Sequence, residues 1–241
     1  MDSQESAGRM NSQHAVMNTG ILSSKSRLTQ KQASLFPGDT LFEKIARTVC
    51  RAGVLPAKEF FEAWEVARRV RRKFRGGRIV DVACGHGLLS HIMLLLDDSS
   101  PEALCVDSRF PKNADTLSNS MLETWPKLEG RIHYQEVPLE AVVMTSNDLV
   151  VSVHACGTLT DAVLGNAISA RARVAVLPCC QDVDRSETGG LKGWLDGPLA
   201  VDVMRAARLG QAGYTVLTRT IPTDITPKNR LLMGCPQEKI E

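Results

Sequence analysis

Short, β-branched segments alternate with helical stretches along most of this chain, and this alternation constrains the fold more than any other feature. Strands are expected at residues 78–83, 103–107, 131–135, 148–153, 173–178, 214–220 and 230–235. The first five lie in successive β-α units, which form a mostly parallel sheet with right-handed crossovers. Only a loop separates the last two strands, so an antiparallel hairpin is expected there. We therefore predict an α/β fold with a mostly parallel seven-stranded sheet, an antiparallel C-terminal strand and helices on both faces.

The chain divides into three segments. Residues 1–37 are rich in Ser, Gln and Asn, so we expect a flexible N-terminal arm that buries too little apolar surface to fold. Residues 38–77 carry apolar side chains at helical spacing, interrupted by Pro56, which predicts N-terminal helices packed on the core. Residues 78–241 form the α/β domain, and a chain of 241 residues has room for one such domain.

Composition narrows the class of protein. The formal charge of +2 neither requires nor excludes a nucleic-acid partner. The seven cysteines lie mostly in apolar runs and show no C-x-x-C spacing, so we expect reduced thiols and no metal site. No apolar run is long enough to span a bilayer, and the N-terminus lacks the apolar centre of a secretory signal. A cytoplasmic protein without a membrane partner is expected. Targeting to an organelle remains an alternative, because Ser, Lys and Arg recur over residues 23–31.

A glycine-rich turn, Asp81-Val82-Ala83-Cys84-Gly85-His86-Gly87, follows the first strand and leads directly into a helix. Glycines allow a sharp turn and a close approach of the backbone to a ligand, and the helix N-terminus offers free N–H groups. Asp81 is placed to face an ammonium group of that ligand. Asp107, at the end of the second strand, can accept hydrogen bonds from both hydroxyls of a ribose. The arrangement predicts a nucleoside cofactor.

Two other interpretations of this turn remain open. Gly85 and Gly87 can form a tight turn that binds nothing, with Asp107 capping the next helix. A nicotinamide cofactor is the second alternative, because Ser90 is small enough for the close helix packing that its motif requires. The Asp81 carboxylate and the terminal strand pair argue against a nicotinamide-dependent oxidoreductase.

A second polar cluster follows the fourth and fifth strands. The fourth continues into Val153-His154-Ala155-Cys156-Gly157-Thr158-Leu159-Thr160-Asp161, and the fifth ends in Leu177-Pro178-Cys179-Cys180-Gln181-Asp182. Ligands of open parallel sheets bind beyond the carboxyl ends of the strands. We therefore expect His154 near the reaction centre, either positioning a substrate and accepting its proton or shaping the loop as a buried histidine. The candidate substrate-binding residues are Cys156, Gly157, Cys179, Cys180 and Gln181.

Taken together, these motifs resemble a known family. The glycine turn, the His-x-Cys-Gly run at 154–157, the Pro-Cys-Cys run at 178–180 and the terminal Thr226-Pro227-Lys228-Asn229-Arg230 look like the methyltransferase-domain family that includes the tRNA acceptor-stem 2′-O-methyltransferase. The resemblance covers about residues 78–235. It implies a Rossmann-like class I methyltransferase fold with S-adenosylmethionine as the methyl donor.

The resemblance also assigns roles to residues. The donor-binding candidates are Asp81, Ala83, Gly85, Gly87, Asp107 and His154, and His154 is also the candidate catalytic residue. Two features depart from the tRNA enzymes. Their Cys/His zinc-binding segments have no counterpart here, and the Cys-Cys run continues into Gln181-Asp182 instead of into histidines. A catalytically silent donor-binding or interaction module of the same fold is therefore the alternative to an active enzyme.

A basic segment bears on the acceptor, which the sequence does not identify. Seven Lys and Arg residues lie between Arg68 and Arg78. If they gather on the face that holds the carboxyl ends of the strands, they can bind phosphates, which makes RNA a candidate acceptor. The alternative is a solvated helix face, since aromatic residues that stack on bases are sparse.

Overall fold

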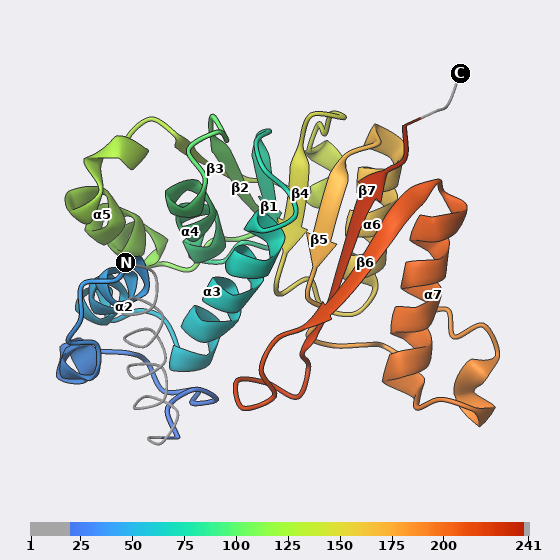
Figure 1. The fold of residues 1–241 in the computed structure, drawn as a ribbon, viewed down its shortest axis with the longest axis horizontal. Coiled ribbons are helices and arrows are strands. Elements are labelled where there is room, and N and C mark those ends of the chain that lie inside the picture. Colours follow the sequence, from blue (N-terminus) through green and yellow to red (C-terminus); the bar gives the residue numbers. More distant parts are fainter. Residues whose placement is uncertain (1–19, 239–241) are drawn as a thin grey trace, which may run out of the picture.

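A computed structural model describes residues 20–238 and contains one seven-stranded sheet in the order β3-β2-β1-β4-β5-β7-β6 (Figure 1). The strands are β1 (Ile79–Val82), β2 (Ala103–Asp107), β3 (Ile132–Glu136), β4 (Leu149–Ser152), β5 (Arg173–Val176), β6 (Tyr214–Thr220) and β7 (Arg230–Pro236). The α-helices are α2 (Leu41–Ala52), α3 (Ala57–Arg71), α4 (Leu88–Leu96), α5 (Ala114–Thr124), α6 (Thr158–Ala170) and α7 (Gly197–Gln211). Helices α4, α5, α6 and α7 follow β1, β2, β4 and β5, as the alternation in the sequence predicted.

The register of the sheet places the carboxyl ends of the central strands side by side. β1 pairs in parallel with β2 and β4, so that Asp81 lies opposite Cys105 on one side and Val151 on the other. β7 lies between β5 and β6 and is antiparallel to both, and it forms the expected hairpin with β6. The prediction of a mostly parallel sheet with an antiparallel C-terminal strand is confirmed.

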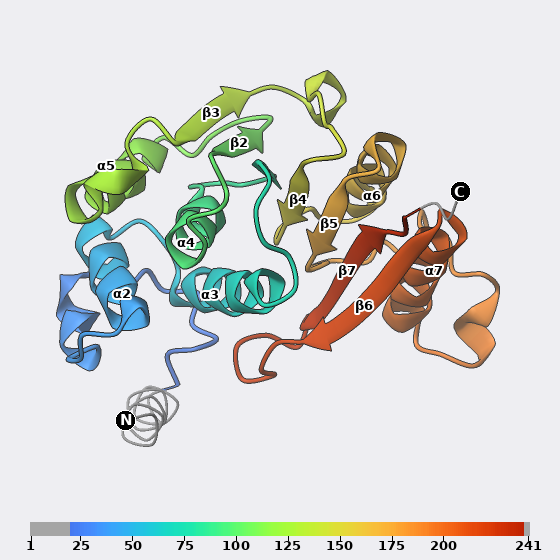
Figure 2. The same cartoon turned by 45° about the horizontal axis from the view of Figure 1, so that its top comes forward.

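Two hydrophobic cores form because successive residues of a strand point to opposite faces of the sheet. Ile79 of β1 packs into a core with α2, α3 and α4, whereas Val80 and Val82 pack into a second core with α6 and α7. Figure 2 shows these two groups of helices on opposite faces. Asp81 shares the face of Ile79, which directs its carboxyl toward Ser90 on α4.

The connection from β3 to β4 differs from the predicted series of five β-α units. Residues 137–148 contain one 3-10 turn, Leu139–Ala141, in place of an α-helix. Leu139 and Val142 are buried in the core shared with α6, so this segment covers the sheet without a helix. The adjacent β-branched residues Val142 and Val143 lower the helix propensity of the stretch.

The predicted flexible arm over residues 1–37 is wrong from residue 20 onward, and residues 1–19 lie outside the described residues. The stretch Gln30–Leu35 forms a 3-10 helix that packs beside α2. Phe36 is buried, and its ring meets the ring of Phe60 edge to face. A few large apolar side chains therefore hold a mostly polar segment against the N-terminal helices.

The two N-terminal helices begin and end as the sequence indicates. Thr40 and Glu43 form a capping box at the start of α2, in which the Thr40 hydroxyl accepts from the Glu43 N–H. Gly53, with φ of 68°, ends this helix. Pro56 then precedes α3, which confirms the predicted break and places α3 against α4.

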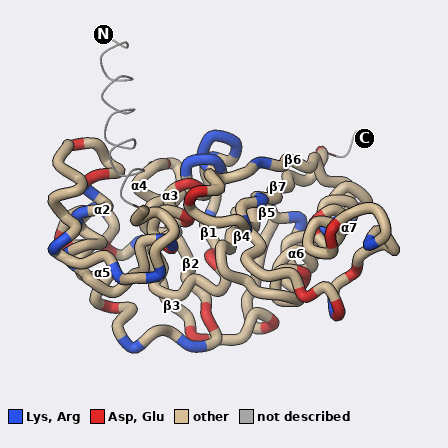
Figure 3. Tube along the Cα trace, turned by 90° about the horizontal axis from the view of Figure 1, so that it is seen from below, with Lys and Arg blue, Asp and Glu red and all other residues tan. Residues whose placement is uncertain are grey.

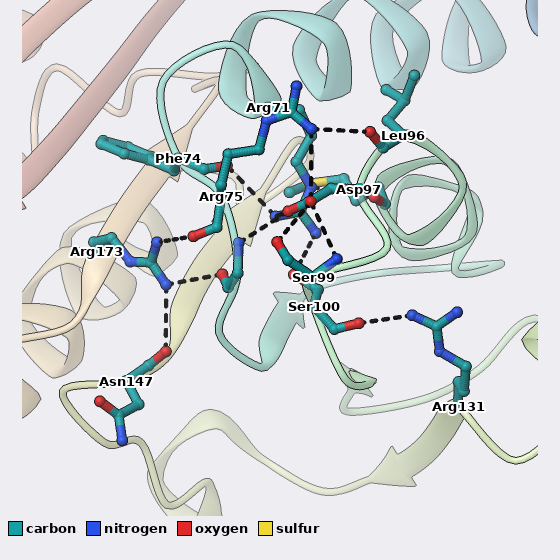
Figure 4. Close-up of polar contacts among 12 residues, drawn as sticks. Arg71, Phe74, Arg75, Leu96, Asp97, Ser99, Ser100, Arg131, Asn147 and Arg173 are labelled. Atoms are coloured by element: carbon teal, nitrogen blue, oxygen red, sulfur yellow. Dashed lines mark hydrogen bonds and ion pairs between the residues drawn. The ribbon is translucent and has the colours of Figure 1, made fainter.

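A buried ion-pair network lies at the C-terminal ends of α3 and α4, near the amino-terminal end of β1 (Figure 4). Arg71 Nη1 lies 3.1 Å from Asp97 Oδ2, and the two side chains are only 2% and 4% exposed. The Ser99 hydroxyl and the Gly76 N–H donate to the same carboxylate at 2.7 and 2.9 Å. Burial acts to raise the pKa of Asp97, but these hydrogen bonds and the charge of Arg71 lower it to about 2.

The basic segment at residues 68–78 is largely engaged within the protein. Arg69 donates to the carbonyl of Thr220, and Arg78 donates to Asp148 at 2.8 Å. The segment leads into the amino-terminal end of β1, whereas the glycine turn follows the carboxyl end. Figure 3 shows one concentrated stretch of Lys and Arg near α3 and β1, and elsewhere Lys and Arg scattered among Asp and Glu. Its position therefore does not match the phosphate-binding face that the sequence suggested.

A membrane-spanning segment was not expected. Over residues 20–238, no helix combines the length and the apolar character needed to cross a bilayer.

Candidate functional site

The turn after β1 uses left-handed backbone conformations. Ala83, Gly85 and Gly87 have φ of 54°, 54° and 74°. A non-glycine residue such as Ala83 holds this conformation only where its surroundings fix it, and such strain clusters at ligand sites. Gly87 is the N-cap of α4 and has no side chain to cap it, which leaves the first N–H groups of the helix for other partners.

The two glycines of the turn have different surroundings. A Cβ at Gly85 would meet no atom within 4 Å, so the backbone there faces open space. A Cβ at Gly87 would lie 2.7 Å from Tyr134 Oη and 3.1 Å from Cys105 Sγ. Gly87 is therefore required for close packing against β2 and β3, while Gly85 leaves its backbone accessible to a ligand.

Asp81 is the buried acid of the site and is 1% exposed. Its carboxylate accepts a hydrogen bond of 3.0 Å from the Ser90 hydroxyl. Burial raises the pKa of Asp81 to about 7, against the opposing effect of the Ser90 hydrogen bond and with a smaller contribution from the charge of Asp107. A buried carboxyl in this state is stabilised as the anion when a cationic group binds beside it.

Asp107, at the end of β2, holds the glycine turn. Its Oδ2 accepts from the Gly85 N–H at 3.0 Å and its Oδ1 accepts from the Arg109 N–H at 3.2 Å. Each carboxylate oxygen keeps a second lone pair, so Asp107 can still accept hydrogen bonds from two ligand hydroxyls. The direct contact with Gly85 places this acid and the open backbone of the turn at one site.

A small pocket brings the two sequence motifs together. It is lined by Leu55, Glu59, Ala63, Asp81, Ala83, Cys84, Gly85, His86, Leu88, Leu89, Val153 and His154. Four of the predicted donor-binding residues are in this set. Gly87 and Asp107 do not line the pocket, although Asp107 contacts its lining residue Gly85. The pocket volume is about 50 Å³, which is room for one small polar group, since a water molecule occupies about 30 Å³ in the liquid.

The pocket and its surroundings fit an amino-acid nucleoside in two parts. The enclosed space beside Asp81 suits an ammonium group. The open space at Gly85, next to Asp107, suits a larger sugar with hydroxyls. The residues of the glycine turn can therefore hold S-adenosylmethionine, the donor that the resemblance implied.

His154 faces a buried acid that the sequence analysis did not identify. Its Nε2 lies 3.8 Å from Glu62 Oε2, and the His154 side chain is 37% exposed whereas that of Glu62 is 1% exposed. Glu62 Oε1 accepts from Lys58 Nζ at 2.6 Å, while Oε2 has no hydrogen-bond partner. Such a carboxylate oxygen can orient the imidazole ring or accept its N–H.

The loops after β4 and β5 are joined by a backbone hydrogen bond. The Gly157 N–H donates to the Cys180 carbonyl at 3.1 Å, and Gly157 is the N-cap of α6. Cys156 and Cys179 come together across the same junction, with their sulfurs 2.7 Å apart. The structure thus gathers four of the five predicted substrate-binding residues.

The fifth, Gln181, is directed toward α7. Its Nε2 donates to Asp202 at 3.0 Å. Asp202 lines a separate cavity of about 530 Å³ between α7 and the β6–β7 hairpin. Pro178 and Arg230 of the quoted motifs line that larger cavity, but none of the predicted donor-binding or substrate-binding residues does. The glycine-turn pocket is therefore the better candidate for the chemistry.

Sequence comparison associates both motifs with one family. A family model described as a methyltransferase domain matches residues 58–184, which is more than half of the chain. The matched range begins in α3 and extends beyond β5, so it includes the glycine turn, His154 and the cysteine run. No curated protein matches the chain.

Two solved structures are similar to this chain at low sequence identity. An O-methyltransferase family protein from Burkholderia thailandensis is 18% identical, with 96% of this chain and 70% of that chain covered and a TM-score of 0.49. The S-adenosylmethionine-dependent methyltransferase SibL, in its apo form, is also 18% identical, with 88% and 66% covered and a TM-score of 0.51. At this identity the likeness to SibL shows the fold alone.

Proposed function

Because this chain belongs to the methyltransferase-domain family and is an S-adenosylmethionine-dependent enzyme, we propose that the glycine-turn pocket binds the donor and that the acceptor enters beside His154. One observation carries the proposal: the glycine turn after β1 and His154 after β4 line the same pocket. The donor-binding motif and the candidate acceptor motif therefore meet at one place.

Three residues hold the donor in this proposal. Asp81 faces its ammonium group, the open backbone at Gly85 lies against its body, and Asp107 accepts hydrogen bonds from the ribose hydroxyls. The bound donor supplies an electrophilic methyl group on a sulfonium. Much of the rate can therefore come from holding an acceptor atom in line with that group.

His154 positions the acceptor in this proposal. Its side chain is 37% exposed, so it can touch an incoming group, and Glu62 Oε2, 3.8 Å from His154 Nε2, can orient the ring. An imidazole can also accept a proton from the acceptor near neutral pH. Cys156, Cys179 and Cys180 form the outer wall of the acceptor site.

Methyl-transfer assays with the full-length protein test this assignment. Methyl-labelled S-adenosylmethionine is incubated with the protein and with separate RNA, protein and metabolite pools. We expect label in one pool, and we expect His154→Ala to lower kcat more than it weakens donor binding. His133→Ala is the matched control, because His133 is an exposed histidine on β3. Donor binding without transfer to any pool would favour the silent module, and an unchanged His154→Ala enzyme would make His154 structural.

RNA as the acceptor is a finer proposal that rests on the family resemblance. The basic segment at residues 68–78 gives it no support, because Arg71 is buried against Asp97 and the segment lies before β1, away from the pocket. Label in the RNA pool that is unaffected by Arg72→Ala would place RNA binding elsewhere on the surface. Label in the metabolite pool alone would contradict an RNA acceptor.

A further inference from the structure

Three cysteines from two separate loops form a cluster at the carboxyl ends of β4 and β5. The sulfurs of Cys156, Cys179 and Cys180 all lie within 4.8 Å of one another. Cys156 and Cys180 are exposed, and Cys179 is half-buried. Neither donor binding nor the proposed role of His154 requires three sulfurs at one point, so the cluster needs an explanation of its own.

The backbone holds this cluster in place before any ligand arrives. The Gly157 N–H binds the Cys180 carbonyl, which fixes the loop of Cys156 to the loop of the other two cysteines. Gly157 has φ of 58°, a conformation that favours glycine and sets the direction of the chain just after Cys156. A site whose ligands are already gathered loses little conformational entropy when an ion binds.

Three thiolates match the chemistry of a zinc ion. Zn²⁺ binds cysteine sulfur at about 2.3 Å, so two sulfurs on one tetrahedral ion lie about 3.8 Å apart. The limit of 4.8 Å on the three separations is compatible with that geometry. The Cys156–Cys179 separation of 2.7 Å must widen by about 1 Å, which a small rotation of an exposed side chain can provide.

The surrounding charges also permit a cation. Three thiolates at this distance repel one another unless a positive ion lies between them. Lys58, a basic side chain whose charge acts on Cys156, is already paired with Glu62 at 2.6 Å.

We propose that Cys156, Cys179 and Cys180 form a zinc-binding site with an open fourth coordination position on its exposed side. Structural zinc sites are closed by four protein ligands, whereas sites with three keep a position for water or a substrate atom. A disulfide between Cys156 and Cys179 is the competing explanation for their short separation, but it leaves the nearby Cys180 sulfur without a role.

Cobalt titration tests the site in the reduced, chelator-treated full-length protein. We expect one Co²⁺ per chain, a sulfur-to-cobalt charge-transfer absorption, and displacement of that absorption by Zn²⁺. Cys180→Ser should weaken binding by at least about tenfold, since losing even a residue that supports a metal ligand has that effect. Cys235→Ser is the matched control, because Cys235 is a half-buried thiol on β7 outside the cluster.

Three results would overturn the proposal. The reduced protein binds no Co²⁺ or Zn²⁺, Cys235→Ser weakens binding as much as Cys180→Ser, or peptide mapping finds a Cys156–Cys179 disulfide in protein that takes up no metal after reduction. Circular dichroism of each variant separates loss of the site from loss of the fold. Donor affinity measured on the same samples keeps this test separate from the proposed function.

Discussion

At the scale of single residues, burial of the Asp81 carboxyl lowers the stability of the folded protein, and the position of Asp81 in the candidate site explains why the residue is there. The carboxyl is buried with one hydroxyl partner, and burial raises its pKa from 3.8 to about 7. The folded protein therefore holds a proton that the unfolded chain releases at lower pH. Stability falls as the pH rises from about 4 to about 7, and the loss stays in place above that range. In the proposed function, the ammonium group of the bound donor offsets this cost.

Asp81→Asn should separate stability from donor binding. The variant removes the ionisation, so its advantage in unfolding free energy should widen from about pH 5 to about pH 8 and reach at most about 4 kcal/mol. Its affinity for S-adenosylmethionine should fall, because the amide carries no charge. Urea unfolding at the two pH values and calorimetry check both effects. Equal stability differences at both pH values would mean that the Asp81 pKa is not raised.

Some residues of the candidate site could be predicted from the sequence, and others could not. Asp81, Gly85 and His154 were predicted from motifs that stand in one stretch of chain each. Glu62 and Lys58 were missed, although their i, i+4 spacing on α3 is visible, because nothing local indicates that this helix face meets the loop after β4. A tertiary contact of that kind leaves no pattern in a single sequence.

At the scale of elements, the glycine turn combines a packing requirement with a binding requirement. Gly87 fits beneath Tyr134, and Gly85 faces open space, yet both adopt positive φ. The sequence pattern predicted the turn and its place after β1 but could not distinguish the two glycines. The same is true of the β3–β4 connection, where buried Leu139 takes the place of a predicted helix.

Alanine at each glycine should therefore have a different effect. Left-handed backbone costs a non-glycine residue about 1–2 kcal/mol, so both variants lose that much stability. Gly87→Ala should lose more, because its Cβ meets Tyr134, while Gly85→Ala should lose more donor affinity. Gly130→Ala is the control, since it also has positive φ and open space but lies far along the chain in another turn. Urea unfolding and calorimetry of all three give the comparison, and equal donor affinities for Gly85→Ala and Gly130→Ala would contradict it.

At the scale of the whole molecule, a stabilising ion-pair network and the proposed binding site lie at opposite ends of the central strands. The proposed donor pocket lies at the carboxyl ends of β1 and β4, and the Arg71–Asp97 network lies near the amino-terminal end of β1. The alternation of strands and helices predicted this architecture because each β-α unit repeats one pattern. The packing of residues 20–37 was not predicted, because its apolar anchors are few and widely spaced.

Asp97→Asn should destabilise the molecule without affecting the site. Removing one partner of a buried ion pair leaves the other charge uncompensated, which costs about 3–5 kcal/mol of unfolding free energy. Affinity for S-adenosylmethionine should stay unchanged where the variant is folded. Asp98→Asn is the control, because Asp98 pairs with Lys127 on the surface and should leave stability as it is. A loss of donor affinity in Asp97→Asn would show that the ion-pair network and the glycine-turn pocket are coupled.

Calorimetric titration with S-adenosylmethionine and S-adenosylhomocysteine tests most directly whether the glycine turn binds the donor. We expect one molecule bound per chain and at least about a tenfold weaker affinity, or 1.4 kcal/mol, for Asp107→Ala, because that variant removes both the ribose acceptor and the contact with Gly85. Equal affinity of the wild-type and Asp107→Ala proteins, or no binding by either, would contradict the assignment of this pocket.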